Sequence, residues 1–142
     1  MKICIVVANY YHKIYKELIN GAKSALSIKG IKKPKIILAP GVFEIPVIIS
    51  KNINEYDAFV ALGCVIKGQT PHFDLITKAA MHGLIDISIK YKKPIGNGII
   101  TCLNKKQAFK RSNPKKKDKG GEASKASLSV LGILKNEQKW YF

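Results

Sequence analysis

Residues 58–74, with the sequence AFVALGCVIKGQTPHFD, pass from a predicted strand to the start of a predicted helix and decide the fold. Their first part, residues 58–62, is a continuous apolar run of the kind found in strands that are buried on both faces. A helix is predicted from Pro71 to about Lys90, because Thr70 is a good N-cap and proline suits the first helical position. The turn between strand and helix therefore lies at the carboxyl end of a buried strand.

The same alternation of apolar strands and amphipathic helices continues on both sides of this stretch. Further strands are predicted at residues 3–8, 35–39 and 95–101. Further helices are predicted from residue 14 to a stop at Gly30, from the 40–41 turn through residue 49, at 105–110 and at 122–135. Strands joined in this way by helices imply right-handed crossovers and a parallel sheet. We expect one domain over residues 1–142, an α/β flavodoxin-like three-layer sandwich with a central four-stranded parallel sheet.

The chain of 142 residues has a net charge of +16, a feature of nucleic-acid-binding proteins. Its lysines are spread along the whole chain and are dense only near residue 115, so we do not favour nucleic acid as a partner. Arg111 is the single arginine among 25 basic residues. Because lysine lacks the planar fork of a guanidinium, Arg111 is a candidate phosphate or carboxylate ligand, the alternative being an ordinary surface residue.

The sequence has no pattern that indicates a metal or a nucleotide cofactor. Cys4, Cys64 and Cys102 form no C-x-x-C pair, and the 3 histidines make no metal-like pair. Neither G-x-G-x-x-G nor a P-loop occurs. No apolar run approaches the ~20 residues of a membrane span, and the first residues resemble no cleavable leader. We expect no metal, no cofactor, no membrane contact and a cytoplasmic location.

Unusual segments follow three of the predicted strands, at residues 9–12, 40–46 and 63–74. Ligands of open parallel sheets bind outside the carboxyl ends of the strands, which is where these segments meet. Tyr10 and Phe43 are suited to stack on a flat heterocycle, or else belong to the core. Glu44, between apolar neighbours, needs a partner such as ligand hydroxyl groups, or else serves as a first-turn helix acid.

The third segment predicts an anion site. Gly68 lets the backbone approach a ligand, and free amides at the helix start favour a phosphate beside Gln69 and Thr70. The plainer alternative is an ordinary capped helix. His72 lies in the first turn, where the helix dipole favours the neutral imidazole that a general base needs, although a surface histidine fits the position as well.

Four motifs together resemble the lumazine synthase family. They are PGVFEIP at residues 40–46, ALGCVIKGQTPHFD at 61–74, NGIIT at 97–101 and KGGEA at 119–123. Their order and spacing fit the family over essentially the whole chain. The resemblance implies condensation of 5-amino-6-(D-ribitylamino)uracil with 3,4-dihydroxy-2-butanone 4-phosphate through a Schiff base, with loss of phosphate and water, to give 6,7-dimethyl-8-ribityllumazine.

The resemblance also implies site residues. Those that bind the pyrimidine reactant would be Tyr10, Val42, Phe43, Glu44, Val65, Ile66, Asn97 and Lys119. Phosphate would be bound by Gln69, Thr70 and Arg111, and His72 would be the base that transfers protons. Asn97 stands where the family commonly has an aromatic or other apolar residue.

The family resemblance further implies a homopentamer with active sites between neighbouring subunits. The turn at 112–118 differs from the Gly-rich turn of shell-forming members, and the chain starts directly at a central strand, so we expect a free pentamer. Two other functions stay open at this point, a basic nucleic-acid-binding module and a flavin-binding carrier on the same fold. The first gives no reason for Glu44, His72 and Arg111 to share one edge of a sheet.

Overall fold

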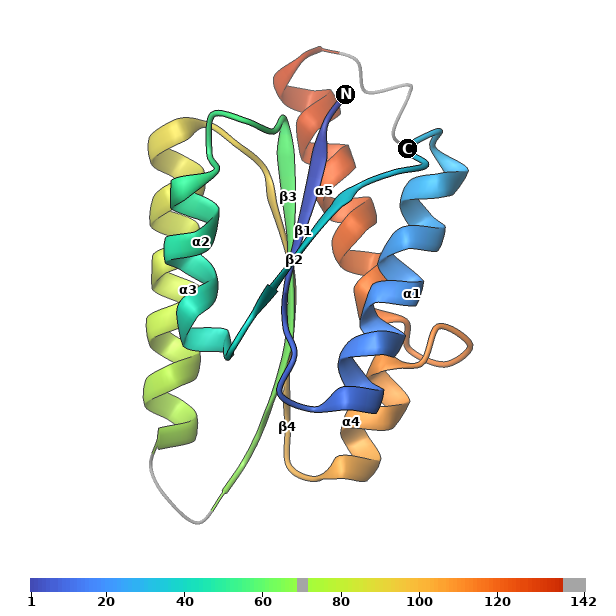
Figure 1. Cartoon of the computed structure of the whole chain (residues 1–142), viewed down its shortest axis with the longest axis vertical. Coiled ribbons are helices and arrows are strands. Elements are labelled where there is room, and N and C mark those ends of the chain that lie inside the picture. The colour runs from blue at the N-terminus through green and yellow to red at the C-terminus, as the bar shows by residue number, and fades with distance from the viewer. Residues whose placement is uncertain (69–71, 137–142) are drawn as a thin grey trace.

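The computed structural model describes residues 1–68 and 72–136, which form a four-stranded sheet with helices on both faces (Figure 1). The strands are β1 (Ile3–Ala8), β2 (Lys35–Ala39), β3 (Ala58–Ile66) and β4 (Ile95–Cys102). They lie side by side in the order β2-β1-β3-β4, and every neighbouring pair is parallel. The expected three-layer α/β sandwich of flavodoxin-like type is confirmed.

Two helix layers cover the sheet. Helices α1 (His12–Ile28), α4 (Lys105–Ser112) and α5 (Lys119–Leu134) lie on one face, and α2 (Ile45–Lys51) and α3 (His72–Tyr91) lie on the other (Figure 1). The short 3-10 turn η1 (Val42–Glu44) leads into α2. Alternate residues of β1 enter two separate cores, Ile3, Ile5 and Val7 on the α1 side and Cys4, Val6 and Ala8 on the α2 side. This is why the strand reads as an unbroken apolar run.

The strand connections run in opposite directions across the sheet on the two sides of the β1–β3 pair. From β1 the chain moves outward to β2, whereas from β3 it moves the opposite way to β4. Carboxyl ends of parallel strands on either side of such a switch point diverge and leave a crevice. All four strands end at the bottom of Figure 1, so the three segments singled out in the sequence meet there.

β3 is longer than predicted. It was expected at residues 58–62, but its pairing with β4 continues as far as Ile66 opposite Cys102. Glycine at position 63 is required for packing within the strand, because a Cβ would lie 2.7 Å from Val42 Cγ2. The motif that follows the apolar run is therefore partly strand.

α5 begins about one turn earlier than predicted, at Lys119. Asp118 adopts a left-handed conformation with φ of 46°, and its Oδ1 accepts the N–H of Gly121 at 3.1 Å. Gly120 has low helix propensity, but a Cβ there would collide with the carbonyl of Leu18. Close packing of α5 on α1 thus overrides local propensity.

The glycines of β4 do not interrupt the strand. Two glycines in a predicted strand, Gly96 and Gly98, indicate either close backbone approach or a bend, and the structure shows the approach. A Cβ on Gly96 would collide with the carbonyl of Ala123 in α5, and one on Gly98 would lie 2.5 Å from Leu62 Cδ2. His12, expected in a loop, is the first residue of α1. Among the described residues, no helix is both long and apolar enough to cross a membrane.

Candidate active site

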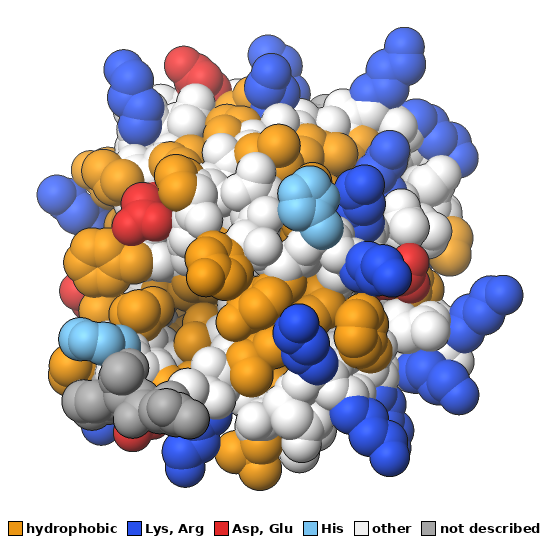
Figure 2. All heavy atoms as spheres, turned by 60° about the horizontal axis from the view of Figure 1, so that its bottom comes forward, with side chains coloured by type: hydrophobic (Ala, Val, Ile, Leu, Met, Phe, Trp, Pro, Cys, Tyr) orange, Lys and Arg blue, Asp and Glu red, His pale blue; other side chains and the backbone are white. Residues whose placement is uncertain are grey.

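The carboxyl edge of the sheet exposes apolar side chains in its middle and Lys and Arg side chains around its rim (Figure 2). After β1, Tyr10 is 72% exposed, and after β2, Phe43 is 61% exposed. Leu103, directly after β4, is also 61% exposed. Large apolar side chains gathered at one edge indicate a surface that a ligand or another subunit covers.

The turn η1 presents Phe43 and Glu44 at this edge. Val42 is buried against β3 and anchors the turn, whereas the ring of Phe43 faces solvent. Glu44 is half-buried, and its Oε1 lies over Gly41, 2.9 Å from where a Cβ would be. Among the described residues, no cation forms an ion pair with Glu44. The carboxylate is therefore available to accept hydrogen bonds from a ligand.

The end of β3 offers backbone groups beside η1. Pairing with β1 ends at Leu62 opposite Val7, whereas pairing with β4 continues to Ile66. Peptide groups of residues 63–66 that face the β1 side thus have no strand partner. The N–H of Phe59 bonds the carbonyl of Pro94 on the β4 side, so the peptide groups of Val65 also face β4, whereas those of half-buried Ile66 face the open β1 side. Since backbone N–H and C=O groups require partners, those of Ile66 are placed to hydrogen-bond a flat ring.

His72 is the first residue of α3 and is exposed. It follows the end of β3 closely in the chain, so it belongs to the same edge as Val65 and Ile66. Gln69 and Thr70, the predicted phosphate ligands of this segment, lie outside the described residues, as does Pro71.

A second group of predicted residues meets on the other face of the sheet. Arg111 and Lys119 line one cavity of about 540 Å³, together with Gln107, Lys110 and Lys117. The guanidinium is fixed, because Nη1 of Arg111 donates a 2.6 Å hydrogen bond to the carbonyl of Thr101. Lys119 Nζ lies 3.0 Å from Glu122 Oε2, but both side chains are exposed and such a pair is weak. The cavity is suited to hold a phosphate group.

Sequence reasoning missed three residues of this cavity. Gln107 and Lys110 precede Arg111 by four residues and one residue and lie on the helix side that faces the same hollow. The spacing of Gln107 and Arg111, which places side chains on one helix face, is the signal that could have found the first. Lys117 is held at the cavity because its N–H donates a 3.1 Å hydrogen bond to the carbonyl of Lys110. No local sequence pattern predicts this bond.

Two cysteine thiols lie beneath the same edge. Burial, together with the neighbouring Cys102, raises the pKa of Cys64 to about 12. Burial also raises the pKa of Cys102, although the Arg111 guanidinium beside it opposes this effect. Both thiols stay protonated at neutral pH and are poor nucleophiles. The chemistry of the edge therefore falls to its carboxylate, imidazole and guanidinium groups.

Asn97 lies apart from the cavity of Arg111 and Lys119. It is exposed in the middle of β4, its Nδ2 donates to Met81 Sδ at 3.1 Å, and its Oδ1 accepts the N–H of Ile99 at 3.1 Å. With Met81 and His82 it lines a hollow of about 320 Å³ between α3 and β4. Within one chain, the structure does not bring Asn97 to the other predicted ligands.

Comparison with known sequences identifies the family. Residues 1–135 match the family described as 6,7-dimethyl-8-ribityllumazine synthase. The chain belongs to this family. It is 39% identical to a 6,7-dimethyl-8-ribityllumazine synthase of Renibacterium salmoninarum, over 95% of this chain and 90% of that protein. It is 38% identical to the protein of that name from Novosphingobium aromaticivorans, over 98% of both chains.

A third relative with the same name, from Bartonella tribocorum, is 40% identical over 94% of this chain and 89% of its own. Membership of the lumazine synthase family makes the chain a transferase enzyme of riboflavin biosynthesis. The nucleic-acid-binding and flavin-carrier alternatives are not favoured. Within residues 1–68 and 72–136, no group of three or more His, Cys, Asp or Glu side chains is placed to hold a metal ion.

Proposed function

We propose that this chain condenses 5-amino-6-(D-ribitylamino)uracil with 3,4-dihydroxy-2-butanone 4-phosphate, releasing phosphate and water, to form 6,7-dimethyl-8-ribityllumazine. The family match over residues 1–135 is the observation that carries this proposal. The layout of the edge supports it, since one part is apolar with a carboxylate and the other is cationic. These features complement a flat polyhydroxylated reactant and a phosphate ester.

The pyrimidine reactant lies between Tyr10 and Phe43, whose exposed rings are free to flank it. Val42 lies beside Phe43 in the pyrimidine site, and backbone groups around Val65 and Ile66 bind the edge of the uracil ring. Glu44 accepts hydrogen bonds from the ribityl hydroxyl groups. Burial of a carboxylate under the ligand is tolerated because those hydroxyl groups supply donors.

The phosphate group is bound by Arg111, together with Gln69 and Thr70. Because Thr101 already holds one arm of the guanidinium, its remaining N–H groups point in a defined direction. Lys119 gives up its weak surface pair with Glu122 and reaches the pyrimidine ring. His72 removes the proton from the attacking amine as the Schiff base forms and assists departure of the phosphate.

We propose that each active site is completed between neighbouring subunits of a homopentamer. In one chain, Arg111 and Lys119 lie on the α4–α5 side of the sheet, whereas η1 and α3 lie on the opposite side. The exposed Tyr10 and Phe43 also suggest a covering neighbour. A cytoplasmic location is part of the proposal, since Cys4, Cys64 and Cys102 are all free thiols, as expected in a reducing compartment.

The reaction is tested by mixing both reactants with the protein and following lumazine absorbance. We expect formation well above the uncatalysed rate, with one phosphate released per lumazine. A rate equal to the uncatalysed one in the presence of folded protein would refute the proposal.

Shared sites are tested by co-refolding two impaired variants, His72→Ala and Arg111→Lys, in equal amounts. In a random mixture, roughly a quarter of the interfaces carry both intact residues, so activity returns if the two residues come from different chains. Activity no higher than the sum of the separate variants would place both residues in one chain. Sedimentation of the wild-type protein tests the pentamer.

A further inference from the structure

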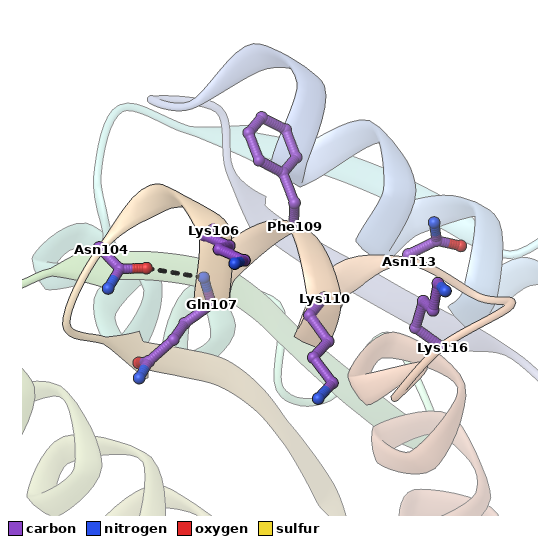
Figure 3. A pocket seen from close by; sticks show the side chains of 7 residues that line it. All are labelled: Asn104, Lys106, Gln107, Phe109, Lys110, Asn113 and Lys116. Carbon is purple, nitrogen blue, oxygen red and sulfur yellow. Dashed lines mark hydrogen bonds between the residues drawn. The ribbon is translucent and has the colours of Figure 1, made fainter.

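A second cavity lies beside the cavity of Arg111 and Lys119. Figure 3 shows the side chains that line it. Its volume is about 600 Å³, which is within the range of small-molecule sites. Three lysines and three amide side chains supply its polar lining, namely Lys106, Lys110, Lys116, Asn104, Gln107 and Asn113. Lys110 and Gln107 line both cavities, so the two are contiguous.

The amide side chains of this cavity have their oxygen atoms already engaged. Asn104 Oδ1 accepts the N–H of Gln107 at 2.9 Å, a bond drawn in Figure 3, and Gln107 Oε1 accepts the N–H of Leu103 at 2.9 Å. Asn113 Oδ1 accepts the N–H of Lys115 at 2.8 Å. One lone pair of each amide oxygen is thus occupied, whereas within residues 1–68 and 72–136 the NH₂ groups of these three side chains form no hydrogen bond with the protein and can donate to a ligand.

The lysines of the cavity have no neutralising partners. In the described part of the chain, ion pairs are formed by Lys119 with Glu122 and by Lys135 with Asp57, and none involves Lys106, Lys110 or Lys116. No carboxylate lines the cavity. Its ammonium and NH₂ groups are all donors, which is the composition of an anion site.

The local structure places the lysines of this cavity where their mutual repulsion and, for Lys106, the helix dipole are unfavourable. Lys106 lies in the first turn of α4, where the helix dipole disfavours a cation, and an anion nearby would offset that effect. The chain after α4 folds back, since the N–H of Lys116 donates to the carbonyl of Asn113 at 2.9 Å. Figure 3 shows Asn113 and Lys116 near each other on the chain after α4, whereas the end of the Lys110 side chain points away from them. Helix α4 and this turn thus place the three lysines along the lining of one cavity.

We propose that this cavity is a second phosphate-binding site, which takes inorganic phosphate beside the Arg111 cavity. The role in turnover rests on the proposed function. The lysines of the site attract the phosphorylated reactant toward the neighbouring cavity, where Arg111 binds its phosphate group, and the site then receives the phosphate that leaves. A small phosphate fits a hollow of this size that opens onto a neighbouring cationic cavity.

The kinetic test is the double variant Lys106→Gln/Lys116→Gln, compared with Lys29→Gln/Lys51→Gln. The control removes the same charge from exposed lysines at the far ends of α1 and α2. We expect the KM of the phosphorylated reactant to rise about threefold to tenfold at low ionic strength, and less at about 0.5 M salt, where charges are screened. The kcat and the pyrimidine KM stay unchanged. A KM equal to that of the control would overturn the proposal.

The binding test does not depend on turnover. Crystals soaked in selenate, an anomalously scattering oxyanion, should show it in both cavities of the wild-type protein and only beside Arg111 in the Lys106→Gln/Lys116→Gln variant. An empty second cavity in the wild-type crystals would overturn the proposal. If selenate binds there but no lumazine forms, the second site stands and the proposed reaction fails.

Discussion

The η1 side and the α4 side of the candidate site are built in opposite ways. On the α4 side, Arg111 is tied to the carbonyl of Thr101, and Asn104 caps the helix that carries it. On the η1 side, Phe43 and Tyr10 are largely exposed, and the ring of Tyr10 packs edge to face on Tyr11, with 4.9 Å between ring centroids. The α4 side is thus preorganised within the chain, whereas the η1 side presents exposed side chains that a ligand or a second subunit can cover.

This difference indicates how the two halves respond to substitution. A preorganised group loses its function when its geometry changes, even if its charge is kept. Side chains that complete their surroundings only with a ligand or a second subunit change the fold of the isolated chain little. Substitutions on the α4 side should therefore be sensitive to shape, and those on the η1 and α3 side to chemistry.

The largest effect is expected for Arg111→Lys. It keeps the charge but removes the planar fork and the bond to Thr101, so both phosphate binding and orientation suffer. We expect kcat/KM to fall about 10³-fold, since misplacement of a reactant by about 1 Å alone costs about 10²-fold. Steady-state kinetics with varied phosphorylated reactant measures this. Full activity in a variant that unfolds at the wild-type temperature would remove Arg111 from the site.

A smaller loss is expected for His72→Ala. General base catalysis contributes about 10²–10⁴-fold, and solvent replaces part of it at an exposed position, so we expect about a 10²-fold fall in kcat with a measurable remnant. The exposed His82, on another part of α3, provides the control His82→Ala, which should keep full activity. Losses of the same size in Arg111→Lys and His72→Ala would contradict the contrast drawn between the two sides.

The fold could be predicted from the sequence because β1 and β3 bury alternate residues in two cores and are therefore unbroken apolar runs. The sequence places the start of α5 too late because Gly120 and Gly121 argue against a helix, whereas their real constraint is contact with Leu18 and Asp118. Arg111 was found by being the single arginine. The neighbouring lysine- and amide-lined cavity could not be found in the same way, since the orientation of its amide side chains depends on hydrogen bonds that exist only after folding.

The turn between α4 and α5 offers a test of how the cationic cavity is held. Asp118 combines a left-handed backbone with a side chain that accepts the N–H of Gly121, so Asp118→Ala loses the cap and keeps the strain. We expect it to lower the free energy of unfolding by about 1–2 kcal/mol, as for other N-caps. Asp118→Asn keeps the cap and tolerates the conformation, so it should cost under about 0.5 kcal/mol. Equal losses in urea unfolding would show that the cap contributes nothing.

The smallest effect is expected at the opposite end of the sheet, at Asp57. Its Oδ2 accepts the N–H of Lys2 at 2.7 Å, and this bond, with a weaker contribution from Lys135, lowers the pKa of the carboxyl. A lowered pKa in the folded state stabilises the protein above the unfolded pKa and ceases to do so as pH falls through the folded pKa.

Asp57→Asn should therefore lower the free energy of unfolding by about 1 kcal/mol or less at pH 7, where the carboxylate is charged, and by less at pH 3. Glu55→Gln is the matched control, because this exposed carboxylate in the same turn forms no ion pair among the described residues. Urea unfolding at the two pH values measures the difference. Lumazine formation should be unchanged in both variants, since Asp57 precedes β3 and the site follows it. A loss of activity in Asp57→Asn would mean that the two ends of the sheet are coupled, and the contrast between the halves of the site would then not be local.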